Sequence, residues 1–304
     1  MEATRAPRAD LLDPTALATL GHIEIVARWI VEGFLSGLHR SPRKGFSVEF
    51  ADFRPYQPGD DLRYVDWKIA ARSDRWVVKQ YEEESNLRAT IVLDVSRSMD
   101  WRGAPAATRL TKHTYAAQLA AALALLLLRQ RDAVGLIRFD DAVRTSIPPR
   151  ARSTQWRRLA AALSAPAGGR ASDVAAALAA TARLVTRRGM VVLVSDLLVD
   201  REAALPALRG LRAAGHDVTV LHIMDPAEHR FAAGADALFT DTETALSVQA
   251  GPSVRAAYDA TVSQVVTEWR DALTAMGGAY ELVLTDAPYA AALRTAFAAR
   301  SRRP

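Results

Sequence analysis

The chain has 304 residues, of which 50% are hydrophobic and 24% are charged, and it contains no cysteine. This composition is that of a globular protein long enough for a large core. The absence of cysteine excludes disulfides, thiolate zinc sites and a cysteine nucleophile. It also suits a reducing compartment, so we expect a cytoplasmic protein.

The formal net charge of +5 comes from basic residues that are scattered along the chain and consist mostly of arginine. No stripe of aromatic residues accompanies them, so we predict a solvated basic surface and no nucleic-acid partner. The longest apolar run, Tyr115 to Leu128, is too short to span a bilayer and is interrupted by Gln118. It predicts a buried helix, and the sequence predicts no transmembrane segment.

The first predicted element is a helix that begins at Asp13-Pro14 and runs to about Leu38. An N-cap carboxylate followed by proline opens it, and apolar residues at three-and-four spacing give it a buried face. A short alternating strand, "FSVEF", follows at residues 46–50, then a charge-dense segment, then a second strand in "WVVKQYEE". We predict that residues 1–88 form a helix and a small strand-containing extension packed on the main domain.

From residue 89 onward, strands and helices alternate. Such alternation predicts an α/β fold over residues 89–304, a Rossmann-like, doubly wound, mostly parallel sheet covered on both faces. Residues 142–147 are predicted to pair back on the preceding strand, and Ala237 to Gly251 to form a small hairpin insertion. The predicted strands are Thr90–Leu93, Ala133–Phe139, Met190–Val194, Val218–Ile223 and Tyr280–Leu284, and the predicted helices are Ala106–Arg129, Thr154–Leu163, Asp173–Arg187, Arg201–Ala214, Ser253–Met276 and Ala287–Ala299.

Polar side chains follow two of these strands at the point where each one ends. Asp94, Ser96 and Ser98 follow the first strand, Asp196 follows the third, and Ser172 precedes a helix. Ligands bind beyond the carboxyl ends of parallel strands, and an all-oxygen set suits a hard cation. We therefore predict a site for Mg²⁺, or for Mn²⁺ or Ca²⁺. The Asp-x-Ser-x-Ser pattern by itself also fits a turn with local side-chain caps.

The stretch "DVSRSM", which contains Asp94, Ser96 and Ser98, resembles the Asp-x-Ser-x-Ser motif of von Willebrand factor A domains. In those domains the motif forms the metal-ion-dependent adhesion site. The resemblance implies a von Willebrand factor A-type fold, and it implies that Ser172 and Asp196 complete the site. Serine stands at position 172 where the family has threonine.

A closer resemblance, from about Leu38 to the C-terminus, is to the bacterial domain of unknown function 58 family. It depends on the charged block from Gly45 to Glu84, and "DPAE" at 225–228 and "DTET" at 241–244 also resemble the family. This resemblance implies a MoxR-type AAA+ ATPase as partner, a chaperone-like or assembly role, and no established catalysis.

The charged block has two open interpretations, a structural platform or a dock for the partner. Aromatic residues interleave with its charges, which favours a rigid, partly buried segment over solvated salt bridges. The residues predicted to bind the partner are Arg54, Asp60, Arg63, Asp66, Trp67 and Arg72.

Three functions compete on this sequence, of which the third, a nucleic-acid binder that uses the scattered arginines, is disfavoured by the lack of an aromatic stripe. The first is a divalent-cation-dependent protein-interaction module, in which a partner, either the ATPase or its client, supplies an acidic residue to the cation. The second is a metal-dependent phosphatase-like hydrolase with Asp94 as nucleophile. Such a hydrolase places a general acid two residues later, where this chain has Ser96, a poor proton donor. We therefore predict a protein that is not an enzyme.

Overall fold

The computed structural model describes residues 22–38, 53–57, 72, 76–79, 87–103, 109–152, 154–168, 173–185, 187–231, 236–240 and 247–300. The chain divides into two compact units. One contains residues 1–35 and 87–304, and the other contains residues 36–86. The first predicted helix is thereby grouped with the sheet, apart from the charged block. The sequence-based division at residue 88 stays a prediction.

A six-stranded sheet forms the centre of the larger unit, in the order β10-β7-β6-β3-β4-β5. All neighbouring pairs are parallel except β4 and β5, which pair antiparallel as predicted. The mostly parallel, doubly wound α/β fold is therefore confirmed. The strands are β3 (Arg88–Asp94), β4 (Ala133–Phe139), β5 (Val143–Arg150), β6 (Met190–Ser195), β7 (Asp217–Met224) and β10 (Ala279–Leu284).

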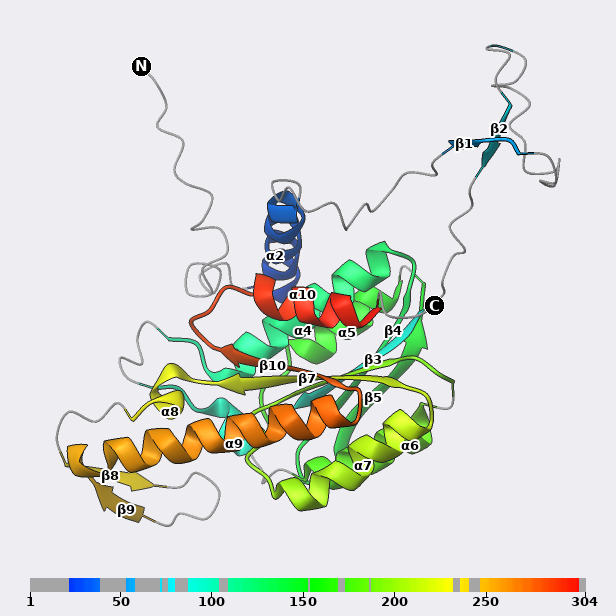
Figure 1. Ribbon diagram of the computed structural model, residues 1–304. Coiled ribbons are helices and arrows are strands. Elements are labelled where there is room, and N and C mark those ends of the chain that lie inside the picture. Colours follow the sequence, from blue (N-terminus) through cyan, green and yellow to red (C-terminus); the bar gives the residue numbers. More distant parts are fainter. Residues whose placement is uncertain are drawn as a thin grey trace, which may run out of the picture. The chain divides into compact units, whose positions relative to one another are not determined.

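Helices cover both faces of this sheet (Figure 1). The strands β3, β4, β6 and β7 are almost wholly buried and apolar, as expected for strands covered on both sides. One layer consists of α4 (Lys112–Arg129), α5 (Thr154–Leu163) and α10 (Ala290–Arg300), and the other of α6 (Val174–Leu184), α7 (Arg201–Ala213) and α9 (Arg255–Ala275).

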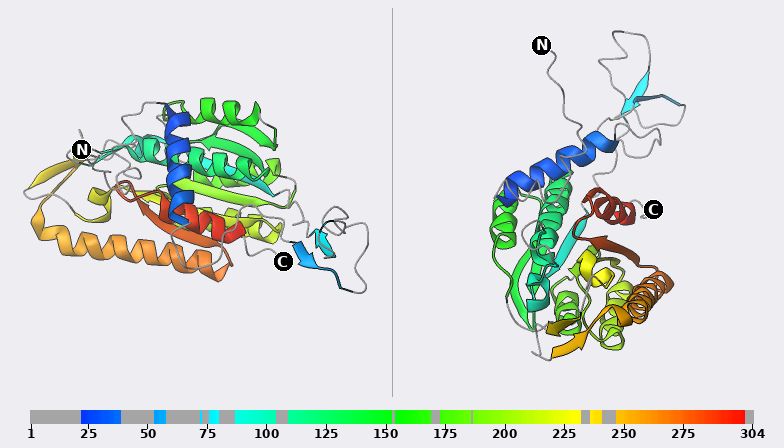
Figure 2. Two further views of the ribbon diagram at one scale, coloured as in Figure 1. Left: turned by 90° about the horizontal axis from the view of Figure 1, so that it is seen from above. Right: turned by 90° about the vertical axis from the view of Figure 1, so that its left-hand side faces the viewer.

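The helix α2 (Ile23–Leu38) belongs to the first predicted helix and lies on the layer that contains α4 and α10 (Figure 2). Its residues Val26, Ile30 and Phe34 are buried, as the three-and-four spacing predicts. The rings of Phe34 and Phe297 of α10 lie 6.2 Å apart. The predicted start at Asp13 lies outside the described residues.

Three short elements complete the larger unit. They are the 3₁₀ turns η3 (Arg97–Asp100) and η5 (Pro252–Val254) and the one-turn helix α8 (Pro226–His229). The predicted hairpin insertion is present as β8 (Ala237–Thr240) and β9 (Ser247–Ala250), which pair antiparallel. None of the helices within the described residues is long and apolar enough to cross a bilayer.

In the smaller unit, β1 (Phe53–Pro55) pairs antiparallel with β2 (Val77–Lys79). The second of these strands was predicted. The first was not, because Pro55 indicated a turn, whereas proline is tolerated where a strand ends at an edge. The predicted strand at residues 46–50 lies outside the described residues.

The strand order fixes where a ligand can bind. From β3 the chain first adds β4 and β5 on one side, and then adds β6, β7 and β10 on the other. The order therefore reverses between β3 and β6, and such a switch point leaves a crevice at the carboxyl ends of the two strands. These are the strands that end at Asp94 and Ser195, directly before Asp196.

Candidate cation site at the carboxyl ends of strands β3 and β6

Two carboxylates lie at the switch point of the sheet. Leu93 pairs with Val194, so Asp94 and Asp196 follow neighbouring strands, and they are 0% and 3% exposed. Burial and the nearby charge of Asp196 raise the pKa of Asp94 to about 6. The hydrogen bonds that Asp94 accepts lower the pKa, but by less. Two buried carboxylates that repel each other favour a shared cation.

Short hydrogen bonds hold the Asp94 carboxylate in one orientation. The backbone N–H of Ser96 donates to Oδ1 at 2.9 Å, and the Ser195 hydroxyl donates to Oδ2 at 2.7 Å. The Ser195 hydroxyl also accepts the backbone N–H of Leu197 at 3.0 Å. Ser195 was not among the predicted site residues. Its place next to Asp196 at the end of a buried strand was the available signal.

Two buried hydroxyls lie side by side on the loop that follows β3. The Oγ atoms of Ser96 and Ser98 are 3.1 Å apart, and the residues are 0% and 3% exposed. Neighbouring ligands of an octahedral Mg²⁺ with bonds of ~2.1 Å lie ~3.0 Å apart. A hydroxyl has two lone pairs, so each can bind a cation. The spacing and the oxygen-only chemistry therefore fit the predicted cation, with Ser96 and Ser98 as direct ligands.

Two described residues on either side of Ser172, Gly168 and Asp173, form hydrogen bonds with the backbone that follows β3 and β4. The N–H of Gly168 donates to the carbonyl of Val95 at 2.5 Å, and the N–H of Asp173 donates to the carbonyl of Asp140 at 2.8 Å. Ser172 itself lies outside the described residues, so its role stays a prediction. Asp173 caps α6 by accepting the N–H of Ala176, as expected of a carboxylate that starts a helix.

Asp196 is paired with a lysine that the sequence analysis did not identify. The Nζ atom of Lys112 lies 2.9 Å from Oδ2 of Asp196 and 2.6 Å from Oε1 of Glu228. Burial lowers the pKa of Lys112, but the two carboxylates outweigh burial and raise it. No local pattern marks Lys112, because its partners lie 84 and 116 residues further along the chain.

A buried histidine supports Asp196 from the neighbouring strand. The Nε2 atom of His222 lies 2.9 Å from the carbonyl oxygen of Asp196, and Nδ1 lies 2.8 Å from the Tyr280 hydroxyl. Burial lowers the pKa of His222 to about 4. Its two nitrogens are thus engaged as a structural histidine, which agrees with the absence of metal-ligand spacing among the histidines.

The "DPAE" segment forms α8 beside this site. Asp225 and Glu228 make a capping box, in which Glu228 Oε2 accepts the N–H of Asp225 at 3.1 Å. Asp225 also accepts the N–H of Gly103 at 3.0 Å and pairs with Arg109 at 2.7 Å. A side chain at position 103 would collide with Asp225 and Ala227. Glycine therefore lets the chain after the Asp94 loop approach α8.

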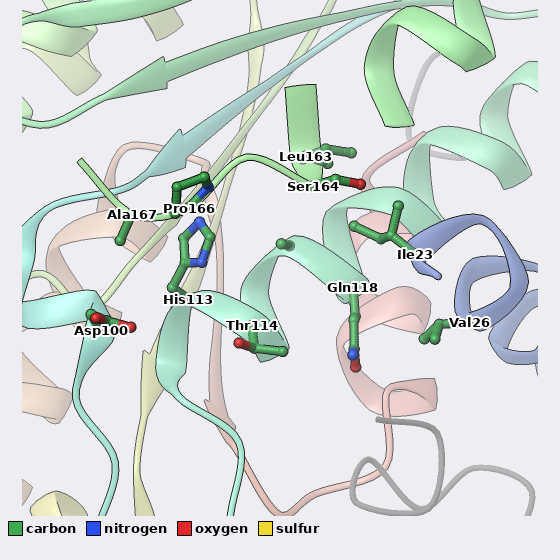
Figure 3. A pocket seen from close by; sticks show the side chains of 11 residues that line it. Ile23, Val26, Asp100, His113, Thr114, Gln118, Leu163, Ser164, Pro166 and Ala167 are labelled. Carbon is green, nitrogen blue, oxygen red and sulfur yellow. The ribbon is translucent and has the colours of Figure 1, made fainter. Parts of the chain in front are cut away.

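A cavity of about 400 Å³ adjoins the same loop between α2, α4 and the end of α5 (Figure 3). Asp100, His113 and Ser164 are among its lining residues. Within the part of the chain that the structure describes, Nε2 of His113 has no hydrogen-bond partner. Burial, and then the charge of Arg138, lower the pKa of His113 to about 4.

The predicted partner-binding residues of the charged block are not brought together by the described part of the structure. Arg54 lies in β1 and Arg72 is exposed. Asp60, Arg63, Asp66 and Trp67 lie outside the described residues. Their role stays a prediction.

Within the described ranges there is also no group of three or more histidine, aspartate or glutamate side chains that could hold a metal. The candidate site therefore depends on its hydroxyls.

Comparisons with known proteins place these features in context. The family model described as "Protein of unknown function DUF58" matches residues 52–268. Uncharacterized protein Rv1480 of Mycobacterium tuberculosis strain H37Rv is 32% identical over 243 residues, covering 78% of this chain and 74% of that protein.

Two solved structures resemble the larger part of the chain. An aerotolerance-related membrane protein from Bacteroides fragilis is 17% identical, with a TM-score of 0.48, over 71% of this chain and 100% of that chain. The conserved hypothetical protein BatB from Bacteroides thetaiotaomicron is 16% identical, with a TM-score of 0.46, over 71% of this chain and 98% of that chain.

Proposed function

The chain belongs to the family described as Protein of unknown function DUF58, and from that premise we propose that it is a protein-interaction module whose binding site is completed by a divalent cation. The observation that carries this proposal is the pair of buried hydroxyls of Ser96 and Ser98, 3.1 Å apart, beside the buried carboxylate of Asp94. A serine pair that only capped a turn would not need to lie at the switch point of the sheet.

When bound, Mg²⁺, or Mn²⁺ or Ca²⁺, would supply the positive charge that attracts a carboxylate of a partner. Ser96 and Ser98 would hold the cation directly, with Ser172 as the further predicted hydroxyl. Asp94 and Asp196 would balance its charge. In a partly desolvated crevice the attraction between the cation and a carboxylate is stronger than in water. Carboxylate oxygen is also a ligand that Mg²⁺ prefers.

The rim of the site offers an apolar surface for a protein partner. Leu198, two residues after Asp196, is 61% exposed. It borders a cavity of about 210 Å³ that is also lined by Asp173 and Ala203. An exposed leucine next to a charged crevice suits a partner that places an apolar contact beside its acidic residue. We propose a MoxR-type AAA+ ATPase, or a client of that ATPase, as this partner, in a chaperone-like or assembly role.

The phosphatase-like alternative is less well supported by the geometry. Both oxygens of Asp94 accept hydrogen bonds, from the backbone of Ser96 and from the Ser195 hydroxyl. These bonds hold the carboxylate in place and reduce its nucleophilicity. The side chain at position 96 is a hydroxyl, which is a poor general acid. We therefore expect no hydrolysis of phosphomonoesters with Mg²⁺ or Mn²⁺.

Titration calorimetry tests the proposal. The wild-type protein should bind one Mg²⁺ or Mn²⁺, and Ser96→Ala with Ser98→Ala should abolish binding without a change in fold. Ser146→Ala, which removes an exposed hydroxyl from the edge strand β5, is the matched control and should bind like wild type. Capture of a purified MoxR-type AAA+ ATPase by the wild-type protein should need Mg²⁺ and fail in EDTA. Equal capture in both buffers would contradict the proposal.

A further inference from the structure

The side chain of Lys112 lies between the candidate cation site and α8. It is 1% exposed, and its ammonium group contacts Oδ2 of Asp196 at 2.9 Å and Oε1 of Glu228 at 2.6 Å. The ring of Trp101 lies 5.9 Å from the same nitrogen. Trp101 directly follows the turn η3, so the loop that contains Ser96 and Ser98 reaches this ammonium group.

An ammonium group removed from water needs carboxylate partners of good geometry. Lys112 has two, and they belong to different parts of the molecule. Asp196 is a predicted ligand at the end of β6, whereas Glu228 is fixed in the capping box of α8 through its other oxygen. The backbone N–H of Lys112 donates to the carbonyl of Trp101 at 3.1 Å. The backbone is therefore anchored, and the ammonium group at the end of the long side chain contacts both carboxylates at once.

A divalent cation at the candidate site and the Lys112 ammonium group need the same carboxylate. Two positive charges on one carboxylate in a buried crevice repel each other strongly, because the effective dielectric constant is low there. We propose that Lys112 is a resident counter-cation of Asp196 that competes with the divalent cation, and that Glu228 keeps the ammonium group when the cation binds. This inference rests on the proposed cation dependence of the site.

The arrangement gives the site two charge states. In the first, Lys112 neutralises Asp196 and the fold is stable without a divalent cation. In the second, the divalent cation replaces Lys112 at Asp196, and the ammonium group pairs with Glu228 alone. Occupancy of the site is thereby linked to α8, whose capping box contains Glu228. Lys112 sets how much cation is needed to load the site.

The test measures Mg²⁺ affinity by titration calorimetry in four full-length proteins: wild type, Lys112→Met, Glu228→Gln and the double variant. Removal of the competing ammonium group should tighten binding in Lys112→Met at least tenfold. Glu228→Gln should weaken binding about tenfold, since among the described residues it leaves Lys112 paired with the Asp196 carboxylate alone. In the Lys112→Met background, Glu228→Gln should change the affinity less than threefold. Such non-additivity separates an effect through Lys112 from a simple change in charge.

Arg109→Met is the matched control. Arg109 pairs with Asp225 at 2.7 Å and not with Asp196. The variant therefore removes a positively charged side chain from a buried carboxylate at the same edge of the sheet, but not from Asp196. It should change Mg²⁺ affinity less than threefold. Lys112→Gln replaces Lys112→Met if the methionine variant fails to fold, since its amide can still donate hydrogen bonds but carries no charge.

The outcomes separate this inference from the proposed function. If wild type binds Mg²⁺ and the folded uncharged variant at position 112 binds equally or more weakly, the inference is wrong and the proposed function stands. If only the variants at position 112 bind Mg²⁺, Lys112 holds the site closed to the cation, and the proposed function of the wild-type protein is wrong. If none of the proteins binds Mg²⁺, both are wrong.

Discussion

Asp94 has a carboxylate whose charge is costly as long as no cation is present. Its pKa of about 6 lies above the ordinary value of 3.8, so the folded protein holds the proton more tightly than the unfolded chain. The cost is absent below pH 3.8 and grows as the pH rises to about 6. Two pKa units correspond to ~3 kcal/mol. In EDTA, Asp94→Asn should therefore gain up to ~3 kcal/mol of unfolding free energy over wild type between pH 4 and pH 7.

Denaturant unfolding of both proteins at several pH values measures this difference. At pH 4, where Asp94 is largely protonated, the two proteins should have nearly equal stability. With Mg²⁺ at pH 7, the wild type should regain stability and Asp94→Asn should not. A pH-independent difference between the two proteins would mean that Asp94 is not the titrating group.

His113 has the opposite dependence on pH. Burial, and then Arg138, lower its pKa from 6.5 to about 4, so the unfolded chain binds the proton more tightly than the folded protein. Its neutral form is fully accommodated above pH 6.5, and stability falls as the pH drops from 6.5 to 4. Over that pH range, His113→Leu should therefore lose ~3 kcal/mol less unfolding free energy than wild type. Thermal unfolding of both proteins at pH 7 and pH 4.5 measures this loss of stability. If His113→Leu loses as much stability as wild type between these two pH values, the prediction is wrong.

At the scale of elements, α8 is too short to be stable by itself, and Asp225 holds it in place. Asp225 is fully buried, caps the helix and binds both Gly103 and Arg109. Asp225→Ala removes a cap and leaves Arg109 without its buried partner, so it should cost ~3 kcal/mol or more. Asp200→Ala removes the exposed N-cap of α7 and should cost only ~1 kcal/mol. Similar losses in the two variants by denaturant unfolding would contradict the role of Asp225.

The elements of the sheet domain could be predicted because local patterns determine them. The strands β4 and β6 begin where the run of apolar residues begins, and α5 was predicted with its observed bounds. Local patterns also placed Asp94 and Asp196 at strand ends, but the pairing of β3 with β6, which brings them together, is a property of the packed fold. Lys112 and Glu228 could not be predicted. A lysine at the start of a helix has no periodic signature, and only the packed fold selects its carboxylate partners.

At the scale of the whole molecule, the first helix depends on the sheet domain. The side chains of Val26, Ile30 and Phe34 are 2%, 0% and 5% exposed, and Phe34 contacts Phe297 near the other end of the chain. A fragment of residues 1–88 exposes this apolar face and has few aliphatic residues to cover it. We predict that the fragment lacks a cooperative thermal transition in circular dichroism. A sharp transition would show that residues 1–88 form an independent domain.

The edge strand β5 contains two consecutive prolines, Pro148 and Pro149, at an irregularity in its pairing with β4. Proline has no N–H group, and the carbonyl of Pro148 accepts a hydrogen bond from Gln155. At these two positions the edge therefore lacks the N–H groups with which a strand of a second copy would pair. Pro148→Thr with Pro149→Val should make the protein self-associate in light scattering at concentrations where wild type does not. The prolines thus protect the sheet against polymerisation through the β5 edge.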